Sequence, residues 1–409
     1  MSEIPTSSLK SPDDRVSESA PGNAAAGNGR SVVSGSASGP HLKFRPRPSG
    51  SGVPVNTIKH APSLRRQPGC LGLLEADAAQ QHRFAALRQA GDFTLAYNTA
   101  VQEGLEYFWG DSQICSDSAK GYLAFSNRKG NIFVLGDPVV GDAGRASLLQ
   151  QFLQRYPHAT FCQVSTPTAA VLETCGYYIN EMGVDTTLPL KEYSFGGKSM
   201  ERIRYAANWL KRRNFEIVEA TYNEIPARLV KEVSDQWRSG RNVKKREMRF
   251  LNRPIRFVDE PGVRKFFLRD ENKKILAFFY FDPLYRDGKV IGYATAIKRR
   301  HPDAPLYTEQ GIMKAAVELF QKEGMEEVKL GLSPLAWIEN RNFRSNPFLH
   351  YSFRYGFNAW WVNRYFYNLQ GHAAYKRHFK GQEEPLHFAS PVLVNDVRIA
   401  SLLRLTGLY

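Results

Sequence analysis

The chain has 409 residues, of which 42% are hydrophobic and 23% charged, ordinary values for a globular protein long enough for two domains. Its 55 Lys and Arg residues exceed its 40 Asp and Glu residues, and the formal net charge is +15. This excess favours an anionic partner, namely nucleic acid, an acidic membrane surface or a phosphorylated substrate, without selecting among them.

The four cysteines have no C-x-x-C spacing, which argues against a disulfide scaffold or a zinc site and favours a reducing compartment. The first residues show neither the basic nor the apolar region of a secretory signal. The sequence contains no run of about 18 apolar residues, the length that a membrane-spanning helix needs. We therefore expect a cytoplasmic protein that can lie peripherally at the inner membrane face.

Residues 1–70 are rich in Ser, Gly, Pro and Ala and contain few large apolar side chains. Such a segment cannot bury enough apolar surface to offset the entropy lost on ordering. The composition predicts a disordered tail, either merely solvated or serving as a basic binding arm.

Residues 71–197 are predicted to form a first α/β unit. Two strands flank the turn "NRKG", and a helix follows in which Leu148, Phe152 and Tyr156 recur every four residues. A buried strand and a short helix that ends at Gly176 come next. The predicted elements are strands 121–126, 131–140 and 159–165 and helices 146–156 and 168–177.

Residues 198–256 form a strongly basic connection that we expect to pack with the second unit. They contain 16 Lys and Arg residues but only seven Asp and Glu residues. A solvated basic face explains this pattern, and so does a phosphate-binding surface to which Arg238 and Lys245 belong. Trp237 and Phe250 bracket the densest part and could stack on bases or lie at a lipid interface.

Residues 257–409 repeat the order strand, strand, helix, strand, which suggests a duplication at the level of the fold. The helix is expected to be capped by Thr308 and to stop at Gly324. The aromatic run 358–367 is interpreted as a core-facing strand, with an apolar groove for an acceptor as the alternative. The other predicted elements are strands 264–270, 273–283, 290–298 and 326–335.

Several short motifs follow one another along both halves of the chain. In the first half these are "VLGDPVVG", "FCQVS" and the run from "CGYYINEMG" through "FGGKSMERIRYAANW". In the second half they are "FFLRDENKKILAFF", "LGLSPL" and a final motif built on Tyr367, Gly371, Tyr375, Lys376 and Phe379. In their order and spacing these motifs, each of them loose, resemble those of the bacterial phosphatidylglycerol lysyltransferases. The resemblance covers roughly residues 95–390.

The resemblance implies an α/β (α+β) fold of tandem GNAT-like acyltransferase lobes with mixed central sheets flanked by helices, and the active site in the second lobe. Enzymes of that family move an aminoacyl group from aminoacyl-tRNA to a hydroxyl of a membrane lipid, without a cofactor. The expected partners are therefore aminoacyl-tRNA and an anionic membrane surface. The chain departs from the family pattern at Glu309–Lys314, where the family tends to Asp-Leu-Met-Arg, and at His378, where it has Lys.

Glu309 and Asp282 are the candidate catalytic residues. Glu309 begins a helix after a strand, where a GNAT-type lobe binds its donor, and it could accept a proton or simply complement the helix dipole. Asp282 stands at a strand end and could equally begin a turn with Pro283. Ser333 could donate a hydrogen bond to an oxyanion or merely end a strand.

Lys376, Arg364 and Tyr375 are the further candidates for substrate binding. Lys and Arg bind phosphate as a point charge and as a bidentate fork respectively, so Lys376 and Arg364 are expected to hold a phosphate. We expect Lys376 and Glu309 to face one cleft. A solvated basic face on a terminal helix is the alternative for Lys376.

The sequence lacks the G-x-S-x-G, H-E-x-x-H, Walker A and G-x-G-x-x-G motifs, which disfavours serine hydrolases, metalloproteases, NTPases and Rossmann enzymes. An acyl-CoA-dependent N-acyltransferase stays open as the alternative function. Lys298, Arg299 and Arg300 precede the helix at 308, but the loop carries only one glycine for cradling a pyrophosphate. The histidines have no metal-ligand spacing, and no metal site is predicted.

Overall fold

The computed structural model describes residues 78–111, 121–240, 247–391 and 396–407. The predicted disordered tail at 1–70 lies outside these residues. The described strands form one mixed sheet of 11 strands in the order β1-β2-β3-β4-β11-β5-β10-β9-β8-β7-β6. Their bounds are β1 Glu106–Trp109, β2 Tyr122–Arg128, β3 Asn131–Leu135, β4 Thr160–Val164, β5 Tyr178–Pro189, β6 Glu216–Glu219, β7 Arg264–Arg269, β8 Ile275–Arg286, β9 Lys289–Arg300, β10 Glu327–Pro334 and β11 Gln382–Ser390.

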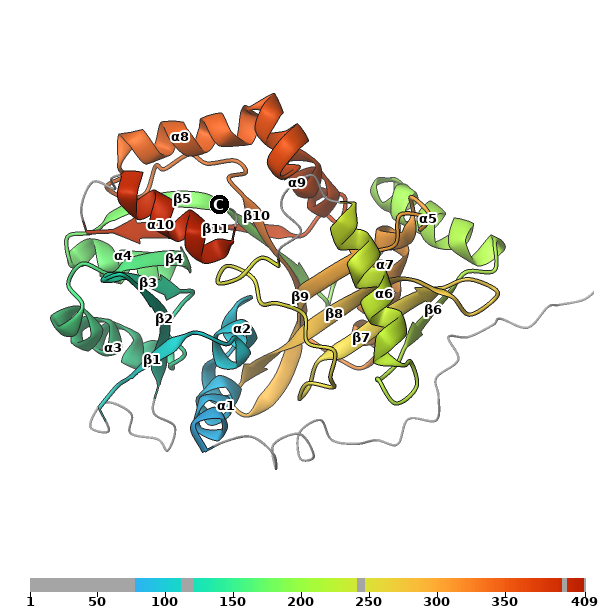
Figure 1. The fold of residues 1–409 in the computed structure, drawn as a ribbon, viewed down its shortest axis with the longest axis horizontal. Coiled ribbons are helices and arrows are strands. Elements are labelled where there is room, and N and C mark those ends of the chain that lie inside the picture. The colour runs from blue at the N-terminus through green and yellow to red at the C-terminus, as the bar shows by residue number, and fades with distance from the viewer. Residues whose placement is uncertain (1–77, 112–120, 241–246, 392–395, 408–409) are drawn as a thin grey trace, which may run out of the picture. The chain divides into compact units, whose positions relative to one another are not determined.

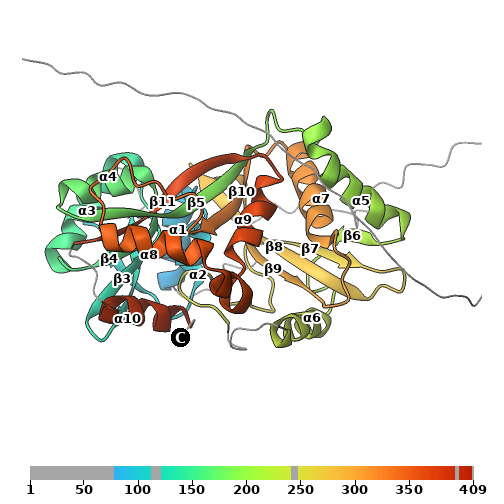
Figure 2. The same cartoon turned by 90° about the horizontal axis from the view of Figure 1, so that it is seen from above.

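Helices cover both faces of this sheet (Figures 1 and 2). In Figure 2 α5 and α7 lie on one face of strands β7 to β9, and α6 lies on the other. The helices are α1 Ala78–Ala90, α2 Ala96–Val101, α3 Asp142–Arg155, α4 Thr166–Thr174, η1 Lys198–Met200, α5 Glu201–Arg212, α6 Ala227–Ser239, α7 Thr308–Lys322, α8 Pro347–Asn358, the π-helical turn η2 Val362–Phe366, α9 Leu369–Arg377 and α10 Asp396–Thr406. The predicted α/β fold, a central mixed sheet flanked by helices, is confirmed.

Strand β8 illustrates why the chain forms a sheet that is buried on both faces. Successive strand residues point to opposite faces. Accordingly, Phe279 and Phe281 pack in the core beneath α5 and α7, whereas Phe278 and Tyr280 pack beneath α6. A strand covered on both faces has a continuous apolar run instead of an alternating one, which is what residues 275–281 show.

The repeated strand order predicted for the two halves is confirmed. Strands β2 and β3 form a hairpin, α3 crosses over, and β4 runs parallel to β3. Strands β8 and β9 form the matching hairpin, α7 crosses over, and β10 runs parallel to β9. We call these segments, residues 122–164 and 275–334, the first and second β-α-β units.

The two halves also exchange strands. Strand β5, which follows the first unit in the chain, pairs with β10 of the second, and β11 pairs with β4 of the first. Strands β5 and β11 are themselves paired, so the sheet is continuous. The division at residues 70, 197 and 256 therefore stays a prediction, since the strands are shared across it.

Two local predictions are wrong. The run 358–367 is not a core-facing strand, because α8 extends to Asn358 and η2 follows at Val362–Phe366, with Trp360 67% and Phe366 54% exposed. A continuous aromatic run shows neither the alternation of a half-buried strand nor the period of an amphipathic helix. Its pattern therefore cannot distinguish strand from helix. Thr308 is not a cap either: it is the first residue of α7, and its buried hydroxyl has no partner among the described residues.

Candidate functional site

The two β-α-β units leave a gap at corresponding places. The parallel pairing of β9 and β10 covers only Gly292–Ala294 and Glu327–Lys329, and that of β3 and β4 covers only Phe133–Leu135 and Thr160–Cys162. The strands then diverge, and the crossover helix of each unit begins beside the gap. A cavity lies beside the start of each crossover helix.

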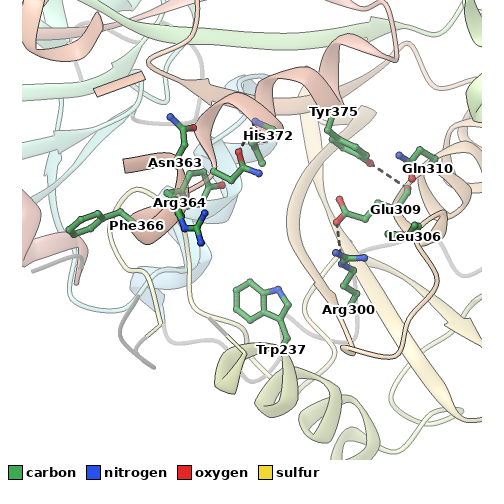
Figure 3. A pocket seen from close by; sticks show the side chains of 13 residues that line it. Trp237, Arg300, Leu306, Glu309, Gln310, Asn363, Arg364, Phe366, His372 and Tyr375 are labelled. Atoms are coloured by element: carbon green, nitrogen blue, oxygen red, sulfur yellow. Dashed lines mark hydrogen bonds and ion pairs between the residues drawn. The ribbon is translucent and has the colours of Figure 1, made fainter. Parts of the chain in front are cut away.

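The first cavity, which we call the aromatic cavity, has a volume of about 510 Å³. It lies where β9 ends and α7 begins, and it is closed by α6, η2 and α9 (Figure 3). In Figure 3 the ring of Trp237 rises from α6 toward the space between Arg364 and Arg300. Its lining is Trp237, Arg300, Leu306, Glu309, Gln310, Asn363, Arg364, Phe366, Tyr367, Asn368, Gly371, His372 and Tyr375.

Glu309 lies in the first turn of α7 on the wall of this cavity, as its sequence position predicted. Its carboxylate is 3.4 Å from the ammonium of Lys298 and 3.9 Å from the guanidinium of Arg300. The Tyr375 hydroxyl donates to the Glu309 backbone carbonyl at 3.4 Å and thereby joins α9 to α7. The carboxylate is thus held between two cations at a helix N-terminus.

His372 is the residue of this cavity that the sequence reasoning missed, because it considered the histidines only as metal ligands. It lies one turn before Tyr375 on α9. Burial, together with the nearby charges of Lys376 and Lys298, holds the pKa of His372 well below its usual value. Its buried Nδ1 has no hydrogen-bond partner among the described residues. A neutral imidazole on the wall of a cavity can accept a proton.

Lys376 faces away from the aromatic cavity. Its side chain is 2% exposed, and its ammonium donates to the backbone carbonyls of Gly331 and, at 2.7 Å, Leu332 on β10. Burial lowers the pKa of Lys376 well below its usual value, opposed by the charge of Asp185. The expected shared cleft is therefore not formed by its ammonium. A phosphate contact by Lys376 stays a prediction that this buried arrangement does not favour.

The backbone of β10 is shaped to receive this ammonium. Gly331 has φ +81° and lies at a bulge in the pairing with β5, a conformation that other residues rarely adopt. Gly183 on β5 is required for a different reason, since a Cβ there would lie 2.2 Å from the Ser333 carbonyl oxygen. These two glycines allow β5, β10 and α9 to meet closely at Lys376.

The second cavity, which we call the acidic cavity, has a volume of about 520 Å³ and lies where β3 ends and α3 begins. Parts of α1, the following loop, β5, β10 and β11 complete it. Three cations line it, namely Arg145, Arg286 and Lys329. Seven carboxylates line it, namely Asp92, Asp137, Asp142, Asp185, Asp287, Glu327 and Glu384.

The carboxylates outnumber their partners. Each cation pairs with one of them: Arg145 with Asp142 at 2.6 Å, Arg286 with Asp92 at 3.2 Å and Lys329 with Glu327 at 3.4 Å. The other four make no ion pair within 4 Å in the described part of the chain.

Two buried carboxylates mark the interior of the acidic cavity. Asp185 is 8% exposed and accepts a hydrogen bond from the Thr94 hydroxyl through Oδ2, while its Oδ1 has no partner among the described residues. Burial raises the pKa of Asp137. Desolvated carboxylates are unfavourable unless a cation compensates them, so the cavity is suited to a positively charged ligand.

The remaining sequence candidates lie outside both cavities. Asp282 is buried and makes a bidentate pair with Arg253, at 3.0 and 2.6 Å, and Arg253 also binds Glu260. Ser333 is fully buried on β10 opposite Val184. Arg238 pairs with Asp235 on α6 and lies 3.5 Å from Glu247. The catalytic and binding roles of these three stay predictions, and Lys245 lies outside the described residues.

The two aromatic residues that bracket the basic connection differ. Trp237 lines the aromatic cavity, whereas Phe250 is 2% exposed and packs in the core with Leu349 and Phe388. Phe250 is therefore not available to stack on a base or to enter a lipid interface. No helix in the described ranges is long and apolar enough to cross a membrane.

Comparison with known proteins gives a consistent result. The family described as "Phosphatidylglycerol lysyltransferase, C-terminal" matches residues 95–390. The phosphatidylglycerol lysyltransferase of Bacillus subtilis is 24% identical over 317 residues, which are 74% of this chain and 34% of the relative. That of Staphylococcus epidermidis is 23% identical over 279 residues, 66% of this chain and 31% of the relative. The chain thus spans about a third of the length of these relatives.

Two solved structures have the same fold. L-PGS from Bacillus licheniformis superposes with a TM-score of 0.64 at 17% identity and covers 80% of this chain and 96% of that one. The C-terminal domain of a putative lysylphosphatidylglycerol synthetase from Agrobacterium fabrum gives a TM-score of 0.63 at 17% identity, with 80% and 95% covered.

Proposed function

Because the chain belongs to the phosphatidylglycerol lysyltransferase C-terminal family, we propose that it is an aminoacyltransferase. It moves an aminoacyl group from aminoacyl-tRNA to a hydroxyl of a phosphatidylglycerol-like membrane lipid, with no cofactor. The observation that carries this proposal is the pair of cavities, one rich in carboxylates and the other lined by Arg300, Arg364 and aromatic rings. A cationic aminoacyl group and an anionic lipid headgroup have these complementary charges.

The acidic cavity is the subsite for the aminoacyl group. Every aminoacyl ester carries an α-ammonium, and a basic amino acid carries a second cation on its side chain. Asp185 and the other carboxylates without ion pairs compensate that charge. The basic connection between the units then faces the tRNA phosphates, whose attraction is electrostatic and salt-dependent.

The aromatic cavity is the subsite for the acceptor. Arg300 and Arg364 hold the lipid phosphate, and the rings of Trp237 and Phe366 pack against its glycerol and acyl carbons. Glu309 fixes Arg300 and Lys298 in place, so it acts here as a positioning residue.

His372 is the proton acceptor in this proposal. The lipid hydroxyl oxygen attacks the ester carbonyl carbon, and its proton passes to the neutral imidazole of His372 in the cavity wall. A new ester bond to the lipid forms as the bond to the tRNA ribose oxygen breaks, and the leaving oxygen takes the proton back from His372. Charge and atoms balance without any added reactant.

The direct test supplies the purified full chain with a set of radiolabelled aminoacyl-tRNAs and phosphatidylglycerol vesicles. We expect label in the lipid phase, lost when ribonuclease is added and strongest for a basic aminoacyl group. If no charged tRNA gives a labelled lipid, the proposal is wrong. Labelled lipid or amine formed from acyl-CoA and resistant to ribonuclease would instead support the acyl-CoA-dependent alternative.

A further inference from the structure

An unusual concentration of exposed aromatic side chains lies on α8 and η2. Eleven large hydrophobic residues of the described chain are exposed, and seven of them fall between residues 348 and 366. Phe348, Tyr351 and Tyr355 on α8 are 56%, 69% and 63% exposed. The other four are Trp360, Trp361, Tyr365 and Phe366. Contiguous exposed apolar surface of this kind marks an interaction site.

These seven side chains form one surface, which we call the α8 face. The residues on α8 are spaced by three and four positions, so they share one side of the helix. Ring contacts extend the surface onto η2: Tyr355 to Trp361 at 6.4 Å, Trp361 to Phe366 at 5.6 Å and Trp360 to Tyr365 at 5.9 Å between centroids. Figure 1 shows α8 on the outer side of β5 and β10.

The chain segment that carries the α8 face is basic, and Glu339 at its start lines a pocket together with Arg354 of α8. Residues 340–382 include seven Lys and Arg residues and neither Asp nor Glu. Of these, Arg354 and Arg364 are exposed on α8 and η2 themselves. In the whole chain Asp and Glu make up 40 of 409 residues, so a stretch of 43 residues without one is a marked local departure.

We propose that the α8 face lies in the interfacial layer of an anionic lipid bilayer. Trp and Tyr prefer the headgroup level of a bilayer. Interfacial helices lie in the plane of that layer with their apolar face buried, and Lys and Arg bind its negative surface. A helix of 12 residues is about 18 Å long and lies flat in that layer without spanning it. The inference rests on the proposed function, and it identifies the surface through which the enzyme reaches its lipid.

The α8 face also leads into the proposed acceptor subsite. Phe366 belongs both to the α8 face and to the wall of the aromatic cavity, and Arg364 on η2 lines the same wall. A lipid whose acyl chains stay in the bilayer under α8 can therefore place its headgroup among Arg364, Arg300 and His372. This continuity explains why the exposed rings gather at this edge of the cavity.

Two other occupants fit the face less well. Single-stranded nucleic acid stacks on free ring faces, but the edge-to-face contacts of Trp361 with Phe366 and of Trp360 with Tyr365 cover part of those faces. A second copy of the chain packed on the same surface would bring two basic segments together, since residues 340–382 of each copy contain seven Lys and Arg residues and neither Asp nor Glu.

The test measures co-sedimentation of the full chain with vesicles of phosphatidylcholine, with and without phosphatidylglycerol. The variant is Tyr351→Ser/Tyr355→Ser/Trp360→Ser, whose positions do not line the aromatic cavity. The control is Tyr205→Ser, an exposed aromatic residue on α5. We expect salt-sensitive binding that requires phosphatidylglycerol and weakens about tenfold or more in the triple variant, with the control unchanged.

A second measurement keeps the test decisive if the triple variant does not fold. Lipids brominated near the headgroup should quench the tryptophan fluorescence of the unaltered protein, and Trp360→Phe/Trp361→Phe should remove most of that quenching. Equal binding by the triple variant, or no quenching, overturns the inference. So does a loss confined to self-association in size exclusion or to tRNA binding.

Failure of this inference and failure of the proposed function are distinguishable. Transfer to phosphatidylglycerol in detergent micelles needs the cavities but not a bilayer. If the triple variant retains transfer in micelles and loses it on vesicles, both proposals hold. If transfer occurs but vesicle binding does not depend on the α8 face, only the docking inference fails. Vesicle binding through this face without transfer in either setting defeats only the proposed function.

Discussion

The aromatic cavity and the acidic cavity occupy corresponding places in two units of the same topology, yet they carry opposite charge. Each lies beside a crossover helix, α7 or α3, where a parallel strand pair diverges after three residues. Each helix even has an acidic residue in its first turn, Glu309 or Asp142. The comparison teaches that the backbone repeats a place for a ligand, whereas the side chains around it decide which ligand enters.

Part of the difference comes from segments outside the two units. The aromatic cavity receives Arg364 and His372 from η2 and α9, and the acidic cavity receives Asp185 and Glu384 from β5 and β11. Because β5 and β11 are the exchanged strands, the strand exchange itself brings carboxylates from distant parts of the sequence to the first unit. We infer that duplication supplied the frame and that the exchange contributed to the chemical difference between the two cavities.

The largest expected effect comes from removing the proposed proton acceptor of the aromatic cavity. His372→Ala removes the only proposed proton acceptor, and general-base contributions are typically 10² to 10⁴ in rate. We expect kcat for aminoacyl transfer to fall by about 100-fold or more with little change in KM for the donor. Steady-state kinetics with labelled aminoacyl-tRNA measures this.

The matched control for that prediction is His378→Ala. His378 lies outside the aromatic cavity and contacts Arg202 at 3.0 Å. The pKa of His372 also predicts how kcat depends on pH. Since burial lowers the pKa of His372 well below its usual value, the base stays neutral as pH falls through 6.5, and kcat should not follow an ordinary histidine titration. A rate that halves near pH 6.5 would contradict the assignment.

The second prediction concerns the residue between the cavities. Lys376→Met removes the ammonium that binds the Gly331 and Leu332 carbonyls, leaving two buried acceptors unpaired. Each unpaired buried group costs about 1–3 kcal/mol, so we expect the free energy of unfolding to fall by roughly 2–4 kcal/mol. Urea unfolding followed by circular dichroism tests this. Unchanged stability with a raised KM for the lipid would instead support the phosphate contact predicted from the sequence.

The sequence predicted the order of strands and helices in the two units better than it predicted the residues of the two cavities. Strand and helix order in both units followed from apolar runs, from turns such as "NRKG" and from Gly324, which has φ +77° after α7. These signals are local. The pairing of β11 with β4 joins residues more than 200 positions apart, and nothing in local periodicity encodes such a pairing.

The candidate site was predicted only in part, because the signals in the sequence are local. Glu309, Arg364 and Tyr375 line one cavity, and two of them belong to the final motif or lie just before it. Lys376 directly follows Tyr375 in the chain. Whether its side chain points into that cavity or away from it depends on how α9 packs on β10, and the sequence does not show that packing. The acidic cavity was missed altogether, because its carboxylates are scattered from Asp92 to Glu384.

The third prediction addresses the acidic cavity alone. Asp185→Asn keeps the shape of the side chain and the bond from Thr94 but removes one charge. We expect the preference for basic over neutral aminoacyl-tRNA to fall by about tenfold, as the loss of one charge-assisted contact implies. Competition between labelled lysyl- and alanyl-tRNA measures the ratio. Asp303→Asn, an exposed residue before α7, is the control and should leave the ratio unchanged.

The smallest expected effect belongs to the aromatic cavity. Arg300→Gln removes one of two proposed phosphate contacts, and Arg300 is partly solvent-exposed, so screening limits its contribution. We expect KM for phosphatidylglycerol to rise about threefold to tenfold while the aminoacyl preference measured for Asp185→Asn stays as in the unaltered protein. Lys322→Gln at the far end of α7 is the matched control. The two substitutions therefore test the assignment from opposite sides: if Arg300→Gln changes the choice of amino acid, or Asp185→Asn changes the lipid KM, the cavities do not divide donor from acceptor.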